Sequence, residues 1–212
     1  MHSFLTLLLA GGVGFTHAFE IDHLLAVSSI VNRRKSMTLA VKDGIFWGLG
    51  HTSTILLIGV LMILMQVAVS ERTFHLFEAG VGVMLAMLGL QRIWEIRRLK
   101  AKHAQAHLHH TDHNHNHSLA YGVGLVHGLA GSGPLVLLVL TQMKSSWEGI
   151  SYLLIFGLGS VLGMLLASGM FFLPFSQSIS RNFTLQRGLT LLSALLCIVF
   201  GCRVAFENLN IL

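Results

Sequence analysis

Long apolar runs separated by short polar segments dominate this chain. A helix needs about 20 apolar residues to cross a bilayer. Six runs reach that length, at residues 3–30, 39–69, 73–97, 118–143, 147–173 and 186–209. Because backbone N–H and C=O groups in lipid must find partners within the segment, each run is expected to be helical. The pattern therefore predicts an all-α polytopic membrane protein with six transmembrane helices.

Composition supports this prediction. Of the 212 residues, 53% are hydrophobic and 11% are charged, and the mean hydropathy is +0.71. A soluble domain usually carries about 25% charged residues. The pI near 9.7 could indicate a nucleic-acid partner, but the basic residues are confined to a few loops, which membrane topology explains better. We therefore expect a lipid bilayer, and no nucleic acid, as a partner.

The basic residues also predict an orientation. The loops after the first, third and fifth runs, with their flanks, hold 11 of the 14 lysines and arginines. These are Arg33, Arg34, Lys35, Lys42, Arg92, Arg97, Arg98, Lys100, Lys102, Arg181 and Arg187. Because basic loops stay in the cytoplasm, both termini are expected outside. The expected location is a bacterial inner (plasma) membrane.

The chain also repeats itself at nearly one offset. Residues 12–17 (GVGFTH) return as 122–127 (GVGLVH), and residues 46–50 (FWGLG) return as 155–159 (IFGLG). A weaker echo of residues 89–95 occurs at 201–207. With three spans in each copy, an odd number, the second copy must be inverted, as in many secondary transporters. The prediction is a 3+3 inverted repeat: a first three-helix repeat at 1–98, a cytoplasmic linker at 99–117 and a second three-helix repeat at 118–212.

Histidine crowds the linker. Seven of the fifteen residues at 103–117 are histidine: His103, His107, His109, His110, His113, His115 and His117. Such a tract binds metal ions in almost any context, but it cannot bury a core, so disorder is expected in the absence of metal. In the cytoplasm it would collect or sense internal metal. A solvated loop without a specific role is the alternative.

A polar heptapeptide, His17-Ala18-Phe19-Glu20-Ile21-Asp22-His23, interrupts the first apolar run. An ionisable side chain at membrane depth costs about 2.5–3.5 kcal/mol on insertion scales, so four of them predict a function. Imidazole and carboxylate together suit a divalent transition metal. A structural ion-pair network is the alternative, and for Glu20 a structural or proton-carrying role is equally open.

One regular helix cannot direct all four groups to one point. His17, Glu20 and His23 share a broad face, whereas Asp22 lies about 140° from His17. Either the helix unwinds near Gly11, Gly12 and Gly14, or only some of the four groups bind the metal. Discontinuous helices of this kind line the sites of many transporters.

Three further histidines are candidate ligands. His51 lies in an apolar run after a glycine-rich stretch, and His127 occupies the position of His17 in the second repeat. Small residues replace the acidic positions there, so the second half is expected to supply His127 and backbone carbonyls freed by glycine and Pro134. An interhelical hydrogen bond is the alternative for either histidine. His2 could chelate Ni²⁺ or Cu²⁺ together with the amino terminus, or be an ordinary start of the chain.

These motifs resemble those of the nickel/cobalt transporter superfamily, including its urease-accessory-type (UreH-like) members. The family hallmark His-Ala-x-Asp-Ala-Asp-His is similar to residues 17–23, and Leu-Gly-His followed by hydroxyl residues is similar to residues 49–54. Residues 126–133 are similar to the second-half motif of the urease-accessory-type members. The resemblance covers essentially the whole chain. It implies transport of Ni²⁺ or Co²⁺, with His17, Asp22 and His23 important. Glu20 and Ile21 depart from the hallmark, which puts strict nickel selectivity in doubt.

The expected function is secondary transport of a divalent transition metal, Ni²⁺ or Co²⁺ first, by alternating access. The metal is the substrate, no prosthetic group is expected, and the chain is not expected to be an enzyme. One alternative is a membrane factor that delivers metal during maturation of a nickel enzyme such as urease or hydrogenase. Another is transport of Mn²⁺, Zn²⁺ or Fe²⁺. A thiol–disulfide carrier is disfavoured because Cys197 and Cys202 share one run. A homo-oligomer is compatible with all of these.

Overall fold

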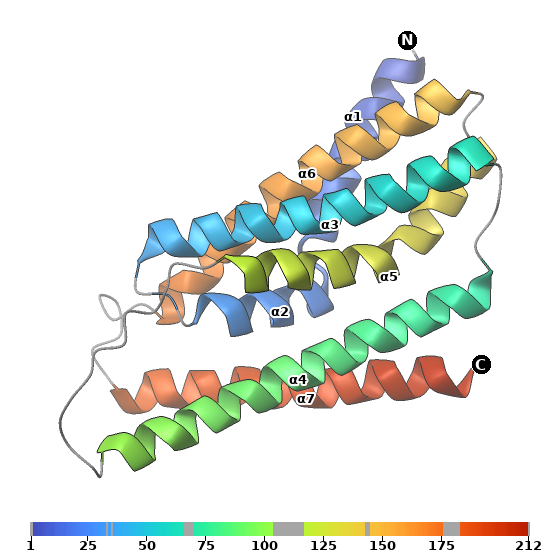
Figure 1. The fold of residues 1–212 in the computed structure, drawn as a ribbon. Helices are drawn as coiled ribbons and strands as arrows, with labels where there is room; N and C mark the ends of the chain where they lie inside the picture. The colour runs from blue at the N-terminus through green and yellow to red at the C-terminus, as the bar shows by residue number, and fades with distance from the viewer. Residues whose placement is uncertain are drawn as a thin grey trace.

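The computed structural model describes residues 2–32, 34, 36–65, 70–103, 117–142, 145–175 and 183–211. Seven α-helices and one short 3₁₀ helix account for nearly all of these residues (Figure 1). They are α1 (His2–His17), α2 (Ile21–Val31), α3 (Met37–Met65), α4 (Glu71–His103), α5 (Ser118–Gln142), α6 (Ser146–Phe172), η1 (Leu173–Phe175) and α7 (Phe183–Asn210).

The chain is an all-α integral membrane protein. Within the described residues, four helices are long and apolar enough to cross a bilayer: Met37–Met65, Glu71–Arg98, Ser146–Phe172 and Thr184–Asn210. They correspond to the second, third, fifth and sixth predicted spans. Helix α4, which corresponds to the third predicted span, is longer than predicted. It continues to His103 and so includes the first residues of the predicted linker.

The first predicted span is broken in two. The apolar helices Leu5–His17 and Ile21–Val31 are each shorter than a span, and Ala18, Phe19 and Glu20 form a turn between them. Such a break was one of the two alternatives that the sequence left open, but its expected place near Gly11, Gly12 and Gly14 is wrong. Those glycines lie inside α1. A methyl group on Gly14 would collide with the carbonyl oxygen of Phe156, so this glycine allows α1 to approach α6 rather than ending the helix.

The helices form two groups with α2 between them (Figure 1). Helices α4 and α7 pack side by side, while α1 packs on α6, and α3 packs on both α5 and α6. Helix α2 contacts both groups. Hydrogen bonds join it to α7, from Asn32 to Thr190 at 2.9 Å and between Ser28 and Ser193 at 3.2 Å. The two termini lie at the same end of the bundle.

Small residues set the distance between helices. A methyl group on Gly124 of α5 would collide with the carbonyl oxygen of Trp47 on α3, as one on Gly14 would with Phe156. Close backbone approach at small residues is typical of helix pairs in membranes, where lipid gives no hydrophobic drive for association. These contacts hold α3, α5 and α6 in the positions from which they present His51, His127 and Phe156.

Candidate metal centre

The turn between α1 and α2 places three polar residues of the heptapeptide together. The amides of Phe19 and Glu20 donate to the carbonyls of Thr16 and His17, at 2.9 and 3.1 Å, which closes the end of α1. Glu20 then adopts an extended backbone (ψ 152°) and is the N-cap residue of α2, which begins at Ile21. His17 is therefore the last residue of one helix, while Asp22 and His23 lie in the first turn of the next. The break removes the angular separation that one helix would impose.

Three imidazole rings meet beside this turn. The ring centroid of His17 lies 4.7 Å from that of His23 and 5.3 Å from that of His51, and His23 lies 5.2 Å from His51. His23 and His51 are fully buried. The ligand atoms of His17, His23 and His51 all lie within 4.8 Å of one another.

His127 and Asp22 extend this group on the side of α5. The ring of His127 lies 4.7 Å from that of His23, and its Nε2 lies 3.7 Å from a carboxylate oxygen of Asp22. Ligand atoms of Asp22, His23 and His127 again lie within 4.8 Å of one another. We call His17, Asp22, His23, His51 and His127 the histidine centre.

Hydrogen bonds fix the tautomers of three of these histidines. Nδ1 of His17 lies 2.8 Å from Glu20 Oε1, Nδ1 of His23 lies 3.1 Å from Asp22 Oδ1, and Nδ1 of His127 lies 3.3 Å from the carbonyl oxygen of Val123. Carboxylate and carbonyl oxygens only accept, so each Nδ1 carries the proton and donates it. Each Nε2 therefore has a free lone pair. A carboxylate or carbonyl behind a metal-binding histidine is the usual arrangement in metal sites.

Five buried imidazole nitrogens of the centre have no hydrogen-bond partner among the described residues. They are His17 Nε2, His23 Nε2, His127 Nε2 and both nitrogens of His51. A buried polar group without a partner costs about 1–3 kcal/mol, so such a concentration needs an explanation. A metal bound at about 2.1 Å holds its ligands no more than about 4.2 Å apart. Small side-chain movements would therefore close either group of ligands onto an ion.

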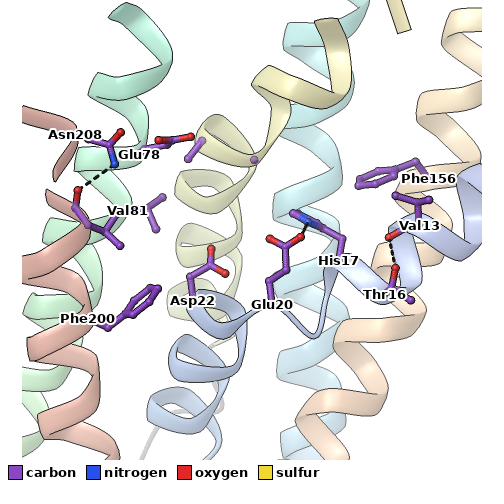
Figure 2. Close-up of a pocket in the computed structure, with 13 residues that line it drawn as sticks. Val13, Thr16, His17, Glu20, Asp22, Glu78, Val81, Phe156, Phe200 and Asn208 are labelled. Atoms are coloured by element: carbon purple, nitrogen blue, oxygen red, sulfur yellow. Dashed lines mark hydrogen bonds and ion pairs between the residues drawn. The ribbon is translucent and has the colours of Figure 1, made fainter. Parts of the chain in front are cut away.

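Glu20 does not take part in either ligand group. Its carboxylate is 56% exposed and accepts the hydrogen bond from His17. Figure 2 shows it reaching over to the His17 ring. From this position Glu20 orients the imidazole, which directs Nε2 toward the other histidines.

A cavity of about 680 Å³ adjoins the centre (Figure 2). His17, Glu20 and Asp22 line it on one side, and Glu78 and Asn208 of the α4/α7 pair line it on the other. Ala130 and Gly131 of α5 form part of its wall. A methyl group on Gly131 would lie 3.2 Å from Nε2 of His17, so this glycine leaves room next to the free lone pair.

The second half contributes a helix that continues through its proline. Helix α5 spans the whole of 118–142 and changes direction in its second half (Figure 1). Proline has no N–H, so Pro134 cannot donate to the carbonyl of Ala130 four residues earlier. This carbonyl loses its helical donor, in the same turn of α5 that borders the cavity.

Of the linker histidines, the structure places only His117 in full. Its Nδ1 donates to Asp43 Oδ1 at 2.7 Å, and its ring stacks on Phe46 with centroids 5.0 Å apart. Asp43 is fully buried and also accepts two hydrogen bonds from the guanidinium of Arg34. His117 therefore lies in a separate network, which we call the Asp43 network (Asp43, Arg34 and His117).

The side chains of the other accessory candidates lie outside the described part of the chain. His107, His109, His110, His113 and His115 lie outside the described residues, and the expected disorder of that segment stays a prediction. The backbones of His2 and His103 are helical, and their side chains lie outside the described part.

Sequence reasoning overlooked Asp43, Glu78 and Asn208. Asp43 and Glu78 are carboxylates within apolar helices, the same signal that singled out the heptapeptide, so both could have been found. Asn208 gave no such signal, because its position beside the cavity depends on how α7 packs against α4. Trp47, whose ring lies 5.5 Å from that of His23, was read only as part of a repeat.

Comparison with known proteins agrees with the motifs. The chain is 35% identical to the urease accessory protein UreH of Bacillus sp. (strain TB-90), over 96% of this chain and 92% of that protein. The profile of the family described as "Cytochrome C biogenesis protein transmembrane region" matches residues 6–203. The chain belongs to this family and is one of its nickel/cobalt-transporter-like members.

A second relative is more distant. This UreH-like chain is 32% identical to the high-affinity nickel transport protein of Cupriavidus necator (strain H16), over 40% of this chain and 25% of that protein. No solved structure matches the chain. The family description also covers proteins of cytochrome c biogenesis, but both cysteines of this chain lie on α7, one buried and one exposed. Five residues apart on one helix, they do not face each other.

Proposed function

We propose that this UreH-like chain is a secondary transporter of a divalent transition-metal ion, with Ni²⁺ first and Co²⁺ second. The observation that carries the proposal is the set of free imidazole nitrogens that converges beside Asp22 inside the bundle. Neutral imidazoles with one carboxylate suit nickel and cobalt better than calcium or magnesium, which prefer oxygen ligands. The names of the two relatives, a urease accessory protein and a nickel transport protein, support nickel.

In this proposal the ligands are His17, Asp22, His23, His51 and His127, and Glu20 holds His17 in place. The two ligand groups share His23. An ion could therefore pass from one group to the other with that side chain as a common ligand. His23, His51 and His127 are buried, while His17 and Asp22 border the cavity. The ion would therefore exchange bound water for imidazole nitrogen as it moves inward from the cavity.

We further propose that residues 1–98 and 118–212 form two inverted three-helix repeats with six spans in all, α1 and α2 together making the first. Several close contacts at glycine support this, because they occur twice at the repeat offset. Gly14 meets Phe156 as Gly124 meets Trp47. Two further pairs are Gly50 with Tyr121 against Gly159 with Gly11, and Gly89 with Ala194 against Gly201 with Gly82. Inverted repeats that move relative to each other around a central site would give alternating access.

The basic loops support an orientation with both termini outside and the linker at 99–117 in the cytoplasm. The cavity extends from the histidine centre toward one end of the α4/α7 pair. Glu78, near the N-terminus of α4, and Asn208, near the C-terminus of α7, line it there. In this orientation it faces the outside. Without a nucleotide-binding motif in the chain, the energy would come from an ion gradient or a partner protein.

Metal flux in proteoliposomes tests the proposal. Ni²⁺, Co²⁺, Zn²⁺ and Mn²⁺ are compared for the parent protein, Asp22→Asn, His17→Ala and the control Glu71→Gln, an exposed acid at the start of α4. We expect flux of one or two of these metals, loss of flux in both centre variants and normal flux in the control. Normal transport by a well-folded His17→Ala protein would contradict the assignment.

The delivery-factor alternative is supported by the similarity to a urease accessory protein over nearly the whole chain. It makes a different prediction for the same experiment. A delivery factor binds metal tightly at the centre, and loses that binding in Asp22→Asn, but gives no flux for any of the four metals.

A further inference from the structure

A second hollow, of about 560 Å³, lies between α2 and α7. The first two turns of α2 line one side of it, and α7 lines the other from Leu189 to Arg203. At a rise of 1.5 Å per helical residue, that stretch of α7 is about 21 Å long. Ile21, Leu192 and Val199 are each more than half exposed along it, so the hollow opens away from the bundle. We call it the α2/α7 groove.

The lining of the groove suits a hydrocarbon chain. The described residues that form it are apolar except for Ser28, Ser193 and Arg203. The two serines are buried and already matched, because Ser28 donates to the carbonyl of Leu25 at 2.7 Å and lies 3.2 Å from the hydroxyl of Ser193. The groove therefore offers little to water. In a bilayer, the apolar molecules that surround such a groove are the acyl chains of lipids.

A pair of opposite charges lies at one end of the groove. Arg203 lines the groove, and Glu207 follows one helical turn later, with Nε of Arg203 donating to Glu207 Oε1 at 2.7 Å. Helix α7 has 28 residues, so it is about 42 Å long, which matches a bilayer with its headgroups. Both residues lie in its last two turns and are 70% and 54% exposed. The pair is therefore at the level of the lipid headgroups.

The order of these features matches the order of groups in phosphatidylethanolamine. Along α7 the apolar groove is followed by a guanidinium and then by a carboxylate, as the acyl chain of this lipid is followed by phosphate and then by a primary ammonium. A guanidinium has five N–H donors and binds phosphate well. The carboxylate of Glu207 can accept from the ammonium. Phosphatidylcholine has no N–H group to donate, and phosphatidylglycerol has no cation.

The geometry points to the α2/α7 groove as a binding site for one phosphatidylethanolamine molecule, with an acyl chain in the groove and the headgroup across Arg203 and Glu207. The site does not depend on the metal proposed for the histidine centre. It does border the same region, because Phe200 of α7 lines both the groove and the cavity beside Asp22 (Figure 2). An acyl chain in the groove would support this ring from behind and so help to shape the cavity.

Photo-crosslinking of the full chain in detergent tests the site. The probe is phosphatidylethanolamine with a diazirine on one acyl chain, and mass spectrometry identifies the labelled residues. We expect saturable labelling within residues 21–28 and 189–203. Unlabelled phosphatidylethanolamine should displace the probe at a concentration about 10-fold lower than phosphatidylcholine or phosphatidylglycerol, since one charge-assisted hydrogen bond is at stake. The exposed leucines Leu57, Leu61 and Leu64 of α3 are the internal control, because ordinary lipid contact there should not saturate.

The decisive variant exchanges the two charges, Arg203→Glu with Glu207→Arg. It keeps both charges and their spacing on the helix but reverses their order relative to the groove. We expect the groove to be labelled as before and the 10-fold preference for phosphatidylethanolamine to disappear. Glu207→Gln should bind phosphatidylethanolamine and phosphatidylcholine equally. Glu71→Gln, an exposed acid at the start of α4, should behave like the parent.

Three results would overturn the site. Labelling of the groove that does not saturate, as on the α3 leucines, would reduce it to ordinary lipid contact. A preference for phosphatidylethanolamine that survives the charge exchange would show that Arg203 and Glu207 do not read the headgroup. A groove that stays unlabelled while the chain is crosslinked to a second copy through α2 or α7 would make the occupant that copy.

Discussion

Two buried polar groups lie eight residues apart on α3, around His51 and around Asp43; the first includes His127 of α5 and the second includes His117, the residue before α5. In the Asp43 network each carboxylate oxygen has a donor, since Oδ2 accepts from Arg34 and Oδ1 accepts from Arg34 and His117. In the histidine centre, five imidazole nitrogens have no hydrogen-bond partner among the described residues. Polar side chains within a membrane bundle are expected to be functional. Burial alone does not distinguish a candidate binding site from a polar network that only holds helices together. The separating property is whether donors and acceptors are already matched.

The largest expected effect is the loss of the Asp43 carboxylate. Asp43→Ala removes the buried carboxylate that accepts two hydrogen bonds from the guanidinium of Arg34, which is itself 16% exposed. Removing one member of a buried ion pair typically costs about 3–5 kcal/mol of stability. We expect a much lower thermal unfolding temperature in detergent.

The double variant Asp43→Ala, Arg34→Ala is its control. Removing both partners leaves no buried charge unmatched, so it should recover part of the lost stability. A double variant that is as unstable as the two single variants added together would contradict the network.

His51→Ala should lower metal affinity and leave stability intact, the opposite of the effect expected for Asp43→Ala. Metal affinity is expected to fall by about 100-fold or more, because a direct ligand is lost, and even the outer groups that orient ligands typically account for about 10–100-fold. The thermal stability of the metal-free protein should stay the same or rise, because two unpaired buried nitrogens are removed. Thermal melts with and without Ni²⁺ measure both quantities. A strongly destabilised metal-free His51→Ala protein would show that the histidine centre is a structural network like that of Asp43.

Glu20→Gln sharpens the distinction within the centre. The glutamine amide oxygen can still accept the hydrogen bond from His17 Nδ1. The substitution removes the negative charge that makes Nε2 of His17 a stronger ligand. We expect metal affinity to fall about 10-fold without a change of metal preference, as measured by competition titrations with Ni²⁺, Co²⁺ and Zn²⁺. A loss as complete as that of Asp22→Asn would instead make Glu20 a direct ligand.

Arg34→Lys should have the smallest effect. A lysine keeps the charge opposite Asp43 but cannot form the two parallel hydrogen bonds of the guanidinium. We expect a loss of about 1 kcal/mol in unfolding free energy, and unchanged metal affinity. A change in metal affinity would show that the two groups on α3 are coupled.

The five residues of the histidine centre were all candidates from the sequence, but the position of the break that brings them together was not predicted. The 100° step per helical residue required either a break or fewer ligands. Glycine was the wrong signal, because the glycines of α1 are used for contact with α6. The turn occurs at Ala18, which is fully buried and faces Gly163 of α6. That contact joins segments about 145 residues apart, so no local pattern could reveal it.

The Asp43 network illustrates the same limit. An aspartate within an apolar run is visible in the sequence, but its partners are a loop arginine and a histidine 74 residues away. The helices themselves were predictable because their apolar runs are long. Their ends in the structure lie within a few residues of the predicted limits, except where α4 continues into the linker.

The turn at Ala18–Glu20 has a further electrostatic consequence. A helix carries about half a negative charge at its C-terminus, from carbonyls that have no amide partner. Because α1 ends at His17, this end of its dipole lies inside the bundle beside the free imidazole nitrogens. Helix α2 begins at Ile21, so its positive N-terminal end lies at the same turn and offsets this charge. The backbone is therefore close to neutral at the break, and the negative charge beside the centre comes from the side chains of Glu20 and Asp22.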